Sequence, residues 1–149
     1  MDKAVLKVKK MRPCGKIPSR ATVGSAALDL CAAVDDVVII EPHCFLSIPS
    51  GIAIELPDEN YVAIVAIRSG ISTKNNISLI NGVGIIDSDY RGEILIGLIN
   101  HSDSPFTIRP GDRIAQLMIT GIFPLDVEVC DELGETSRGE GGFGSTGTK

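Results

Sequence analysis

A carboxylate stands at the end of an apolar run in the stretch NGVGIIDSDYRGE, residues 81–93. Asp87 ends that run, and Tyr90 follows three residues later at a hairpin turn. Gly82 and Gly84 leave the preceding backbone bare, which favours the close approach of another molecule to the main chain. A bare strand edge offers N–H, C=O and N–H in sequence, and uracil presents the complementary acceptor, donor and acceptor. The alternative interpretation is a solvated hairpin turn without a ligand.

A second stretch, IRSG at residues 67–70, has groups that suit phosphate. Arg68 supplies a planar guanidinium and Ser69 a hydroxyl, at a point where a helix could begin. A guanidinium binds phosphate oxygens in pairs, and the N–H groups at a helix start add further donors. By itself, so short a combination is a weak signal.

Two more segments place polar side chains among apolar ones. The segment PGDRIAQLM spans residues 110–118. We expect Asp112 and Arg113 to form an ion pair with each other, which leaves Gln116 as the functional side chain. In SAALDLCAA, Asp29 is a carboxylate between apolar neighbours. It is either a charge at a sheet edge or an anchor for waters around a hard cation.

The end of the chain is rich in glycine. Residues 142–149, GFGSTGTK, nearly match the phosphate-binding loop G-x-x-x-x-G-K-[ST], with the last two residues reversed. That loop needs a strand before it and a helix after it, so we expect no NTPase of that type. Successive N–H groups of Gly, Ser and Thr still form an anion-binding nest. With Arg138 for charge and Phe143 for stacking on a base, residues 138–149 are predicted to be a flexible lid.

Short runs rich in Val and Ile, separated by turn signals, must position these segments. The runs are residues 5–8, 37–40, 51–56, 61–67, 82–86, 93–99 and 113–119. Strands of this length at this spacing predict an all-β sandwich or barrel. Helix signals are confined to residues 68–76, with Ser69 or Ser72 as the cap.

The segment after the last strand differs from the rest of the chain. Residues 124–137 carry Val127 and Val129 in an extended pattern, so we expect an arm that lies against a surface. Residues 1–123 are then the barrel core, and core, arm and lid belong to one domain.

The composition of the chain excludes several classes of protein. The 149 residues are 44% hydrophobic and 22% charged, which suits one globular domain with its own core. A net charge of −5 argues against nucleic acid as a partner, because phosphate backbones need a basic surface. With no apolar run of roughly 18 residues and no signal peptide, we expect a cytoplasmic protein without a membrane partner. The four cysteines form no C-x-x-C pair, and we expect reduced, mostly buried thiols.

Five segments, in this order along the chain, together resemble the five motifs of the trimeric all-β dUTPases, enzymes that hydrolyse dUTP to dUMP and pyrophosphate. The segments are residues 25–33, 67–70, 81–93, 110–118 and 138–147. The similarity runs from about residue 17 to residue 147, and GIIDSDYRGE and RGEGGFGSTG are its most specific parts. The resemblance implies a distorted jelly-roll of short strands with at most one short helix. It also implies a homotrimer whose sites lie between subunits, with the arm at residues 124–137 packed on a neighbouring subunit and the lid supplied by a third chain.

The same resemblance implies a role for each site residue. For the phosphate chain it implies Arg68, Ser69, Gly70, Gln116, Arg138, Gly144, Ser145 and Thr146. For uracil and deoxyribose it implies Asn81, Gly84, Ile85, Ile86, Tyr90, Leu95 and Phe143. Asp29 would hold Mg²⁺ through water, and Asp87 would orient and deprotonate the attacking water.

Three positions depart from the family pattern. Leu28 stands where the family usually has an aromatic residue, and Ile67 where it usually has Pro. Residues 71–76 replace a common L-A-x-K-x-G pattern. None of these removes a group expected to do chemistry, so we expect them to affect packing alone.

Three other functions remain as alternatives. The dCTP deaminases share the fold and some motifs, but they need a Glu as proton shuttle where this chain has Gly97. Glu93 is the nearest carboxylate, four residues early. A nucleotide-sensing trimer without turnover would need neither Asp87 nor the lid. A structural jelly-roll shell protein would explain the strands but not the arginines.

Overall fold

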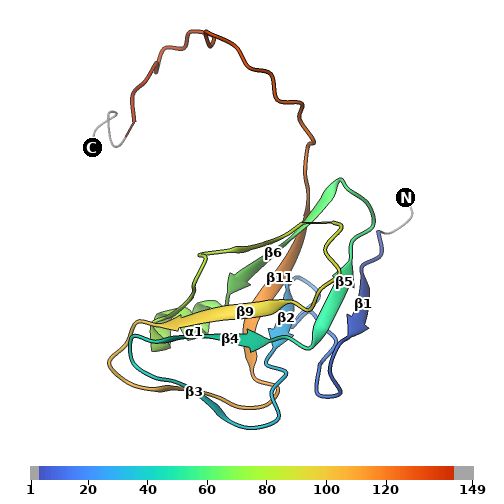
Figure 1. The fold of residues 1–149 in the computed structure, drawn as a ribbon, viewed down its shortest axis with the longest axis vertical. Helices are drawn as coiled ribbons and strands as arrows, with labels where there is room; N and C mark the ends of the chain where they lie inside the picture. Colours follow the sequence, from blue (N-terminus) through green and yellow to red (C-terminus); the bar gives the residue numbers. More distant parts are fainter. Residues whose placement is uncertain (1–3, 143–149) are drawn as a thin grey trace.

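The structure, a computed structural model, describes residues 4–142. Within these residues the chain forms eleven strands and one short helix (Figure 1). In chain order they are β1 (Lys7–Lys10), β2 (Leu28–Cys31), β3 (Val38–Ile40), β4 (Phe45–Pro49), β5 (Ile52–Glu55), β6 (Tyr61–Ile67), α1 (Ser69–Asn75), β7 (Ile77–Leu79), β8 (Gly84–Ile86), β9 (Leu95–Asn100), β10 (Phe106–Ile108) and β11 (Arg113–Gly121). The predicted all-β class with a single short helix is confirmed.

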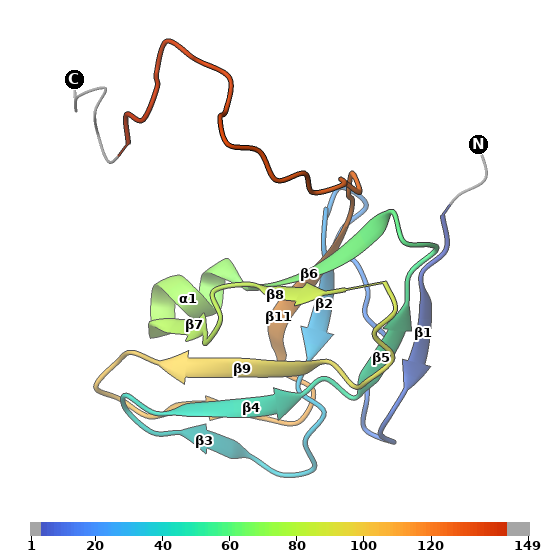
Figure 2. The ribbon, with the colours of Figure 1, turned by 45° about the horizontal axis from the view of Figure 1, so that its top comes forward.

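All strand pairs described are antiparallel. The largest sheet has the order β2-β11-β6-β8, and a three-stranded sheet has the order β4-β9-β7. Two small ribbons, β1-β5 and β10-β3, complete the body. Figure 2 shows β4 and β9 side by side, with β6 and β8 above them in that view. The two sheets therefore enclose a core between them, as in a sandwich.

The core follows from the alternation of apolar side chains along short strands. On β9, Ile96, Leu98 and Asn100 are buried while Leu95 is exposed. Isoleucine, valine and leucine fill most of the core, because β-branched side chains pack well on a pleated surface. This frame fixes the register of the strands that carry the candidate site, since a slip of one residue would turn every side chain to the other face.

Each of the seven apolar runs overlaps a strand, but four further strands lie outside these runs. The strands missed are LDLC, FLSIP, ISL and FTI, which are β2, β4, β7 and β10. They are three to five residues long and contain polar residues. A segment this short shows no periodicity, and its partner strand lies far away in sequence.

The helix α1 begins where expected but not by the expected cap. Arg68 is the N-cap residue, in extended conformation, and no side chain caps the helix. The prediction of Ser69 or Ser72 as cap is therefore wrong. Asn76 ends the helix in the left-handed conformation with φ of 53°, which Asn tolerates better than most residues.

The four cysteines are free thiols with unequal exposure. Cys14 and Cys31 are partly buried, whereas Cys44 and Cys130 are exposed, so the expectation of mostly buried thiols is wrong for the last two. Burial raises the pKa of the Cys31 thiol, which keeps it protonated at neutral pH. Among residues 4–142, no helix is long and apolar enough to cross a bilayer.

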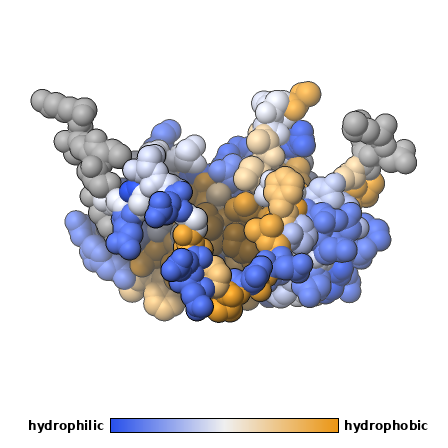
Figure 3. All heavy atoms as spheres, turned by 90° about the horizontal axis from the view of Figure 1, so that it is seen from above, coloured by the Kyte–Doolittle hydropathy of each residue, from blue (hydrophilic) through white to orange (hydrophobic). Residues whose placement is uncertain are grey.

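After β11 the chain leaves the body as an extended arm (Figure 1). Residues 124–135 form neither helix nor strand. Leu125 is 84% exposed, and Val127 and Val129 are each 94% exposed. Figure 3 shows apolar side chains gathered in a recessed part of the face from which the arm rises. Both the arm and this face thus present apolar surface to the solvent, which is the pattern of an interaction surface.

Candidate functional site

A pocket of about 520 Å³ collects the polar residues that the sequence assigned to phosphate. Its lining includes Asp29, Arg68, Ser69, Gly70 and Gln116. These residues come from β2, β11 and the junction of β6 with α1. Gln116 lies directly opposite Asp29 in the β2–β11 pair and opposite Ala66 in the β6–β11 pair, so the three point to one face of the sheet. The amide of Gln116 donates to the carbonyl of Ile67 at 3.0 Å, which fixes its orientation.

Asp29 joins two guanidinium groups in this pocket. Its Oδ1 lies 3.0 Å from Arg68 Nε, and its Oδ2 lies 3.0 Å from an NH1 of Arg113. Arg68 also donates to the carbonyl of Arg113 at 3.3 Å. The Asp29 side chain is only 15% exposed, so its charge needs these partners. One carboxylate between two guanidiniums leaves a net positive charge, which suits an anionic ligand.

The expected ion pair between Asp112 and Arg113 does not form. Asp112 Oδ2 instead accepts from the Arg109 N–H at 2.8 Å and closes the turn before β11. Arg113 faces Asp29 because the β2–β11 register shifts between Arg113 and Ala115. This bulge inserts one residue and turns Arg113 to the face of Asp29. Strict alternation would have placed it with the buried Ala115 and Leu117.

A second pocket, of about 280 Å³, lies along β8. Asn81, Gly84, Ile85, Ile86 and Leu95 all contribute to its lining. Because β8 is the outer strand of its sheet, N–H and C=O groups along its free edge have no strand partner and can pair with a ligand. A Cβ at Gly84 would lie 3.1 Å from the Cβ of Val65. A side chain at this position would therefore press on Val65 and displace its neighbour by a few tenths of an ångström.

Asp87 and Tyr90 line an adjoining hollow of about 220 Å³ together with Ile85, Ile86 and Leu95. Because these three apolar residues border both spaces, the hollow continues the β8 pocket. Asp87 is exposed, at the end of β8. The hydroxyl of Tyr90 donates to the carbonyl of Glu93 at 3.0 Å, and the ring covers Gly92, where any Cβ would collide with it. The turn thus holds an aromatic face beside a carboxylate.

The side chain of Glu93 stabilises this turn. Its Oε1 accepts from Arg12 Nε at 2.7 Å and from the Gly51 N–H at 2.9 Å. The hydrogen bond from Arg12 is the main cause that holds the pKa of Glu93 below its ordinary value of 4.5, and it raises the pKa of Arg12 in turn. No sequence pattern linked these residues, because Arg12 and Glu93 are 81 positions apart.

Gly97 is packed in a way that bears on the deaminase alternative. A Cβ at this position would lie 2.9 Å from Ile80 Cδ1. A glutamate there would therefore require Ile80 to move. Ile80 Cδ1 is the end of a flexible side chain that is 51% exposed, so this movement costs little.

The two pockets open on opposite faces of the same sheet. Ile64 and Ala66 of β6 line the phosphate pocket, whereas Val65 between them lines the β8 pocket. Neighbouring residues on a strand point to opposite faces. Within one chain, the residues assigned to phosphate and those assigned to uracil are therefore separated by the thickness of the sheet.

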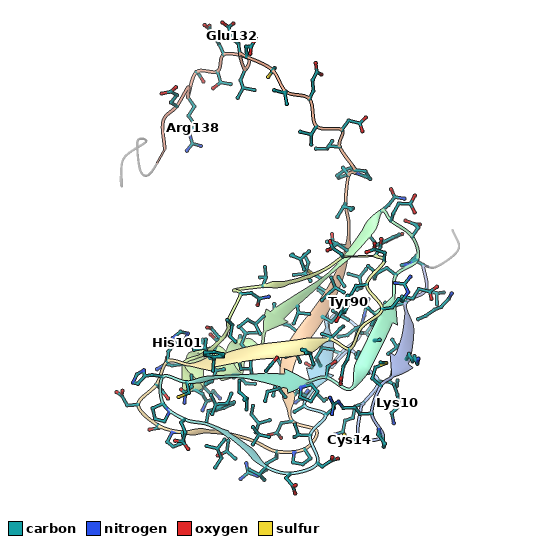
Figure 4. All side chains as sticks on the ribbon, viewed as in Figure 1. Lys10, Cys14, Tyr90, His101, Glu132 and Arg138 are labelled. Atoms are coloured by element: carbon teal, nitrogen blue, oxygen red, sulfur yellow. The ribbon has the colours of Figure 1, made fainter. Side chains whose placement is uncertain are left out.

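The residues assigned to the lid are not brought to either pocket. Arg138 lies at the far end of the arm, well away from Tyr90 on the body (Figure 4). Its Nε donates to the Gly141 carbonyl at 2.7 Å, within the arm itself. Phe143, Gly144, Ser145 and Thr146 lie outside the described residues.

The carboxylates of the described residues do not make a metal cage. No group of three or more His, Cys, Asp or Glu side chains is arranged to hold an ion between residues 4 and 142. Asp29 stands alone as the carboxylate in the phosphate pocket. A lone carboxylate suits Mg²⁺ that arrives with a polyphosphate and keeps its waters, since this ion is commonly bound by substrate phosphates and one or two carboxylates.

Known proteins resemble this chain over nearly its full length. The family model described as dUTPase matches residues 14–147. The deoxyuridine 5′-triphosphate nucleotidohydrolase of Desulfitobacterium hafniense is 50% identical over 132 residues, covering 89% of this chain and 87% of that protein. The protein of the same name from Neisseria meningitidis is 46% identical, covering 95% of each chain. Among solved structures, the dUTPase of Staphylococcus bacteriophage 80alpha with dUPNHPP has a TM-score of 0.88 at 27% identity, covering 97% of this chain and 99% of that one.

Proposed function

This chain belongs to the dUTPase family and hydrolyses dUTP, and we propose that it does so at sites combining the phosphate pocket of one subunit with the β8 pocket of another. The observation that carries this proposal is the position of the two pockets on opposite faces of one sheet. A single nucleotide has to reach its base pocket and its phosphate pocket at once. It can do so only if a second copy of the chain brings its phosphate pocket to the first copy's β8 edge.

The β8 edge selects the base. Uracil presents O2, N3–H and O4 as acceptor, donor and acceptor, which complement the free N–H and C=O groups along Gly84–Ile86. Cytosine reverses two of these three positions, so the backbone itself rejects it. Asn81 and Leu95 close the two sides of the pocket.

Tyr90 selects the sugar. Its ring stands in the hollow next to the base pocket and is held in place by the hydrogen bond to Glu93. Deoxyribose stacks on that ring, and the ring leaves no room for a 2′-hydroxyl. Discrimination between dUTP and UTP then comes from a rigid aromatic side chain.

Asp87 activates the attacking water. Asp87 is exposed and lines the hollow with Tyr90, beside the place that we propose for the sugar and the first phosphate. It aims the water in line with the phosphoryl group and accepts its proton as the bond forms. The proton goes to a carboxylate oxygen of Asp87, and pyrophosphate leaves.

Arg68, Ser69, Gly70 and Gln116 bind the phosphate chain. Charge neutralisation is the main task in phosphoryl transfer, because the leaving pyrophosphate carries most of the negative charge. Arg68 offers planar paired donors, and the hydroxyl of Ser69 offers a neutral one. Mg²⁺ bound to the phosphates would add positive charge there, and Asp29 would hold its waters.

The arm and the lid complete the site from a further subunit. Leu125, Val127 and Val129 are exposed on an extended segment that has no strand partner among the described residues. Burying each such side chain contributes about 1.5–3 kcal/mol, so the arm is stable only against another surface. A homotrimer with exchanged arms would then bring Arg138 and residues 143–146 over a neighbour's nucleotide.

Mixing two inactive variants tests the shared site. Asp87→Asn removes the base from one half-site, and Arg68→Ala removes phosphate binding from the other. If equal amounts are unfolded and reassembled together, about a quarter of the sites combine two intact halves, as random mixing of symmetric subunits requires. Each variant reassembled alone should remain inactive. Failure of the mixture to recover pyrophosphate release from dUTP, while native protein recovers it, would place both halves in one chain.

A substrate comparison tests the reaction itself. Pyrophosphate release is measured with dUTP, UTP, dTTP and dCTP, each with and without Mg²⁺. We expect turnover of dUTP alone and no ammonia from dCTP. Release of ammonia from dCTP would support the deaminase alternative instead.

A further inference from the structure

We propose that Arg113 is a positioning residue of the phosphate site, which holds Asp29 so that Arg68 is free to turn to the phosphate chain. The inference rests on the proposed role of Arg68 in binding phosphate. It adds a residue that does not line the phosphate pocket and whose effect on substrate passes through another side chain.

The contacts of Asp29 divide evenly between the two arginines. Arg68 holds Oδ1 through its Nε at 3.0 Å, and Arg113 holds Oδ2 through NH1 at 3.0 Å. The side chains of Asp29, Arg68 and Arg113 are 15%, 30% and 52% exposed. The carboxylate is thus the most enclosed member, and Arg113 is the member nearest to solvent.

A phosphate chain in the pocket competes with Asp29 for the guanidinium of Arg68. Arg68 lines the phosphate pocket, so its donors turn to phosphate oxygens when the pocket fills. If Arg68 were the only partner of Asp29, that turn would leave an enclosed carboxylate unpaired, which is strongly unfavourable. Because Arg113 keeps Oδ2 paired, Asp29 tolerates the departure of Arg68. Removing Arg113 would therefore tighten the hold of Asp29 on Arg68 and oppose substrate binding.

The backbone shows how Arg113 reaches this position. The bulge between Arg113 and Ala115 sets Arg113 opposite Cys31, which lies two residues from Asp29 on the same strand face. The Asp112 turn immediately before it is closed by the bond from the Arg109 N–H. A turn and a bulge together hold this arginine at a fixed distance from Asp29, although half of its side chain is in solvent.

The test is a double-mutant cycle on substrate binding rather than on turnover. Binding of a non-hydrolysable α,β-imido analogue of dUTP is measured by calorimetry for the native chain, Arg113→Ala, Asp29→Asn and the double variant. We expect Arg113→Ala to weaken binding about tenfold in the native background, the scale of one charge-assisted hydrogen bond at a half-exposed site. In the Asp29→Asn background the same change should weaken binding less than about twofold, since the partner is already gone.

Two outcomes of the cycle would overturn the proposal. Equal weakening in both backgrounds would mean that Arg113 acts on phosphate directly through its charge. No weakening in the native background would mean that it has no part in binding. If the native chain itself fails to bind the analogue, the proposed function fails instead, so the two failures are distinguishable.

Two controls separate positioning from a general loss of structure. Arg109→Ala removes the same charge from the neighbouring turn, where the side chain is exposed, and should leave analogue affinity within about twofold of native. Binding of 2′-deoxyuridine, which has no phosphate, should be equal for native and Arg113→Ala. A parallel loss of deoxyuridine binding would show that the variant disturbs the whole fold and would contradict the proposed role.

Discussion

Arg12 Nε lies 2.7 Å from Glu93 Oε1, and this ion pair ties the N-terminal segment to the turn that carries Asp87 and Tyr90. Glu93 also accepts from the Gly51 N–H, while its own carbonyl accepts from the Tyr90 hydroxyl. One residue therefore connects three segments that are distant in sequence. The position of the proposed sugar-binding ring depends on a contact that takes no part in the reaction.

This brace predicts a pH dependence of stability. Because the pKa of Glu93 is lowered in the folded chain, its contribution is fully present above the ordinary value of 4.5 and is lost as the pH falls through the folded value. Glu93→Gln should lower the melting temperature at pH 7, and the difference from the native chain should shrink below pH 4.5. Thermal unfolding of both proteins across pH 3–7 measures this. A difference that stays constant across that range would mean that the charge of Glu93 is not what stabilises the turn.

The role proposed for Asp87 predicts that its substitution lowers turnover but not substrate binding. Asp87→Asn keeps the size of the side chain and removes its basicity, so affinity for the imido analogue should stay within about threefold while kcat falls by roughly 10²–10⁴-fold. Steady-state pyrophosphate release and analogue titration provide the two numbers. A variant that retains most of its kcat would remove Asp87 from the reaction.

The lid is tested by truncation. Deleting Gly139 to Lys149 should leave a folded assembly that has lost most of its activity, because the proposed role of this segment is to close over bound substrate. Circular dichroism, light scattering and pyrophosphate release are measured on the same preparation. Unfolding of the truncated chain would assign the segment a structural role instead.

The packing of Gly84 leads to a prediction about the β8 pocket. Gly84→Ala places a Cβ 3.1 Å from the Cβ of Val65, so β8 must shift by a few tenths of an ångström. We expect KM for dUTP to rise about tenfold, since a shifted edge no longer aligns its N–H and C=O groups with uracil. Gly121→Ala, in the same sheet, is the matched control, because its nearest atom is the Asn60 carbonyl oxygen at 3.8 Å. Equal effects of the two substitutions would contradict a specific role for the β8 edge.

Sequence reasoning succeeded where the signal is local. The runs that became β6, β9 and β11 are rich in Val, Ile and Leu and are bounded by turn residues, and the glycines before Asp87 are visible in the sequence itself. It failed where a partner was needed. The Ser cap was wrong because nothing local distinguishes Ser69 from Arg68 at the helix start, and the Asp112–Arg113 pair was wrong because adjacency does not decide which face a side chain takes.

The amino-acid sequence contains one signal for the bulge, a pair of adjacent apolar residues. Ile114 and Ala115 are both apolar and both buried, which a regular strand between a core and a solvent face does not allow. Two consecutive core residues next to an arginine indicate an extra residue in the strand. The partner of that arginine, however, is 84 positions away and follows only from the paired strands.

The linear order of residues determined the all-β class and the segments that hold chemical groups, because turn preference and side-chain alternation act over a few neighbours. It also determined the family, since the five motifs occur in the family's order. Only tertiary structure decided which charges meet: Asp29 between Arg68 and Arg113, and Glu93 between Arg12 and Gly51. Only it placed the phosphate pocket and the β8 pocket on opposite faces of one sheet. The reason is physical, because strand pairing and its register join residues that the chain keeps far apart.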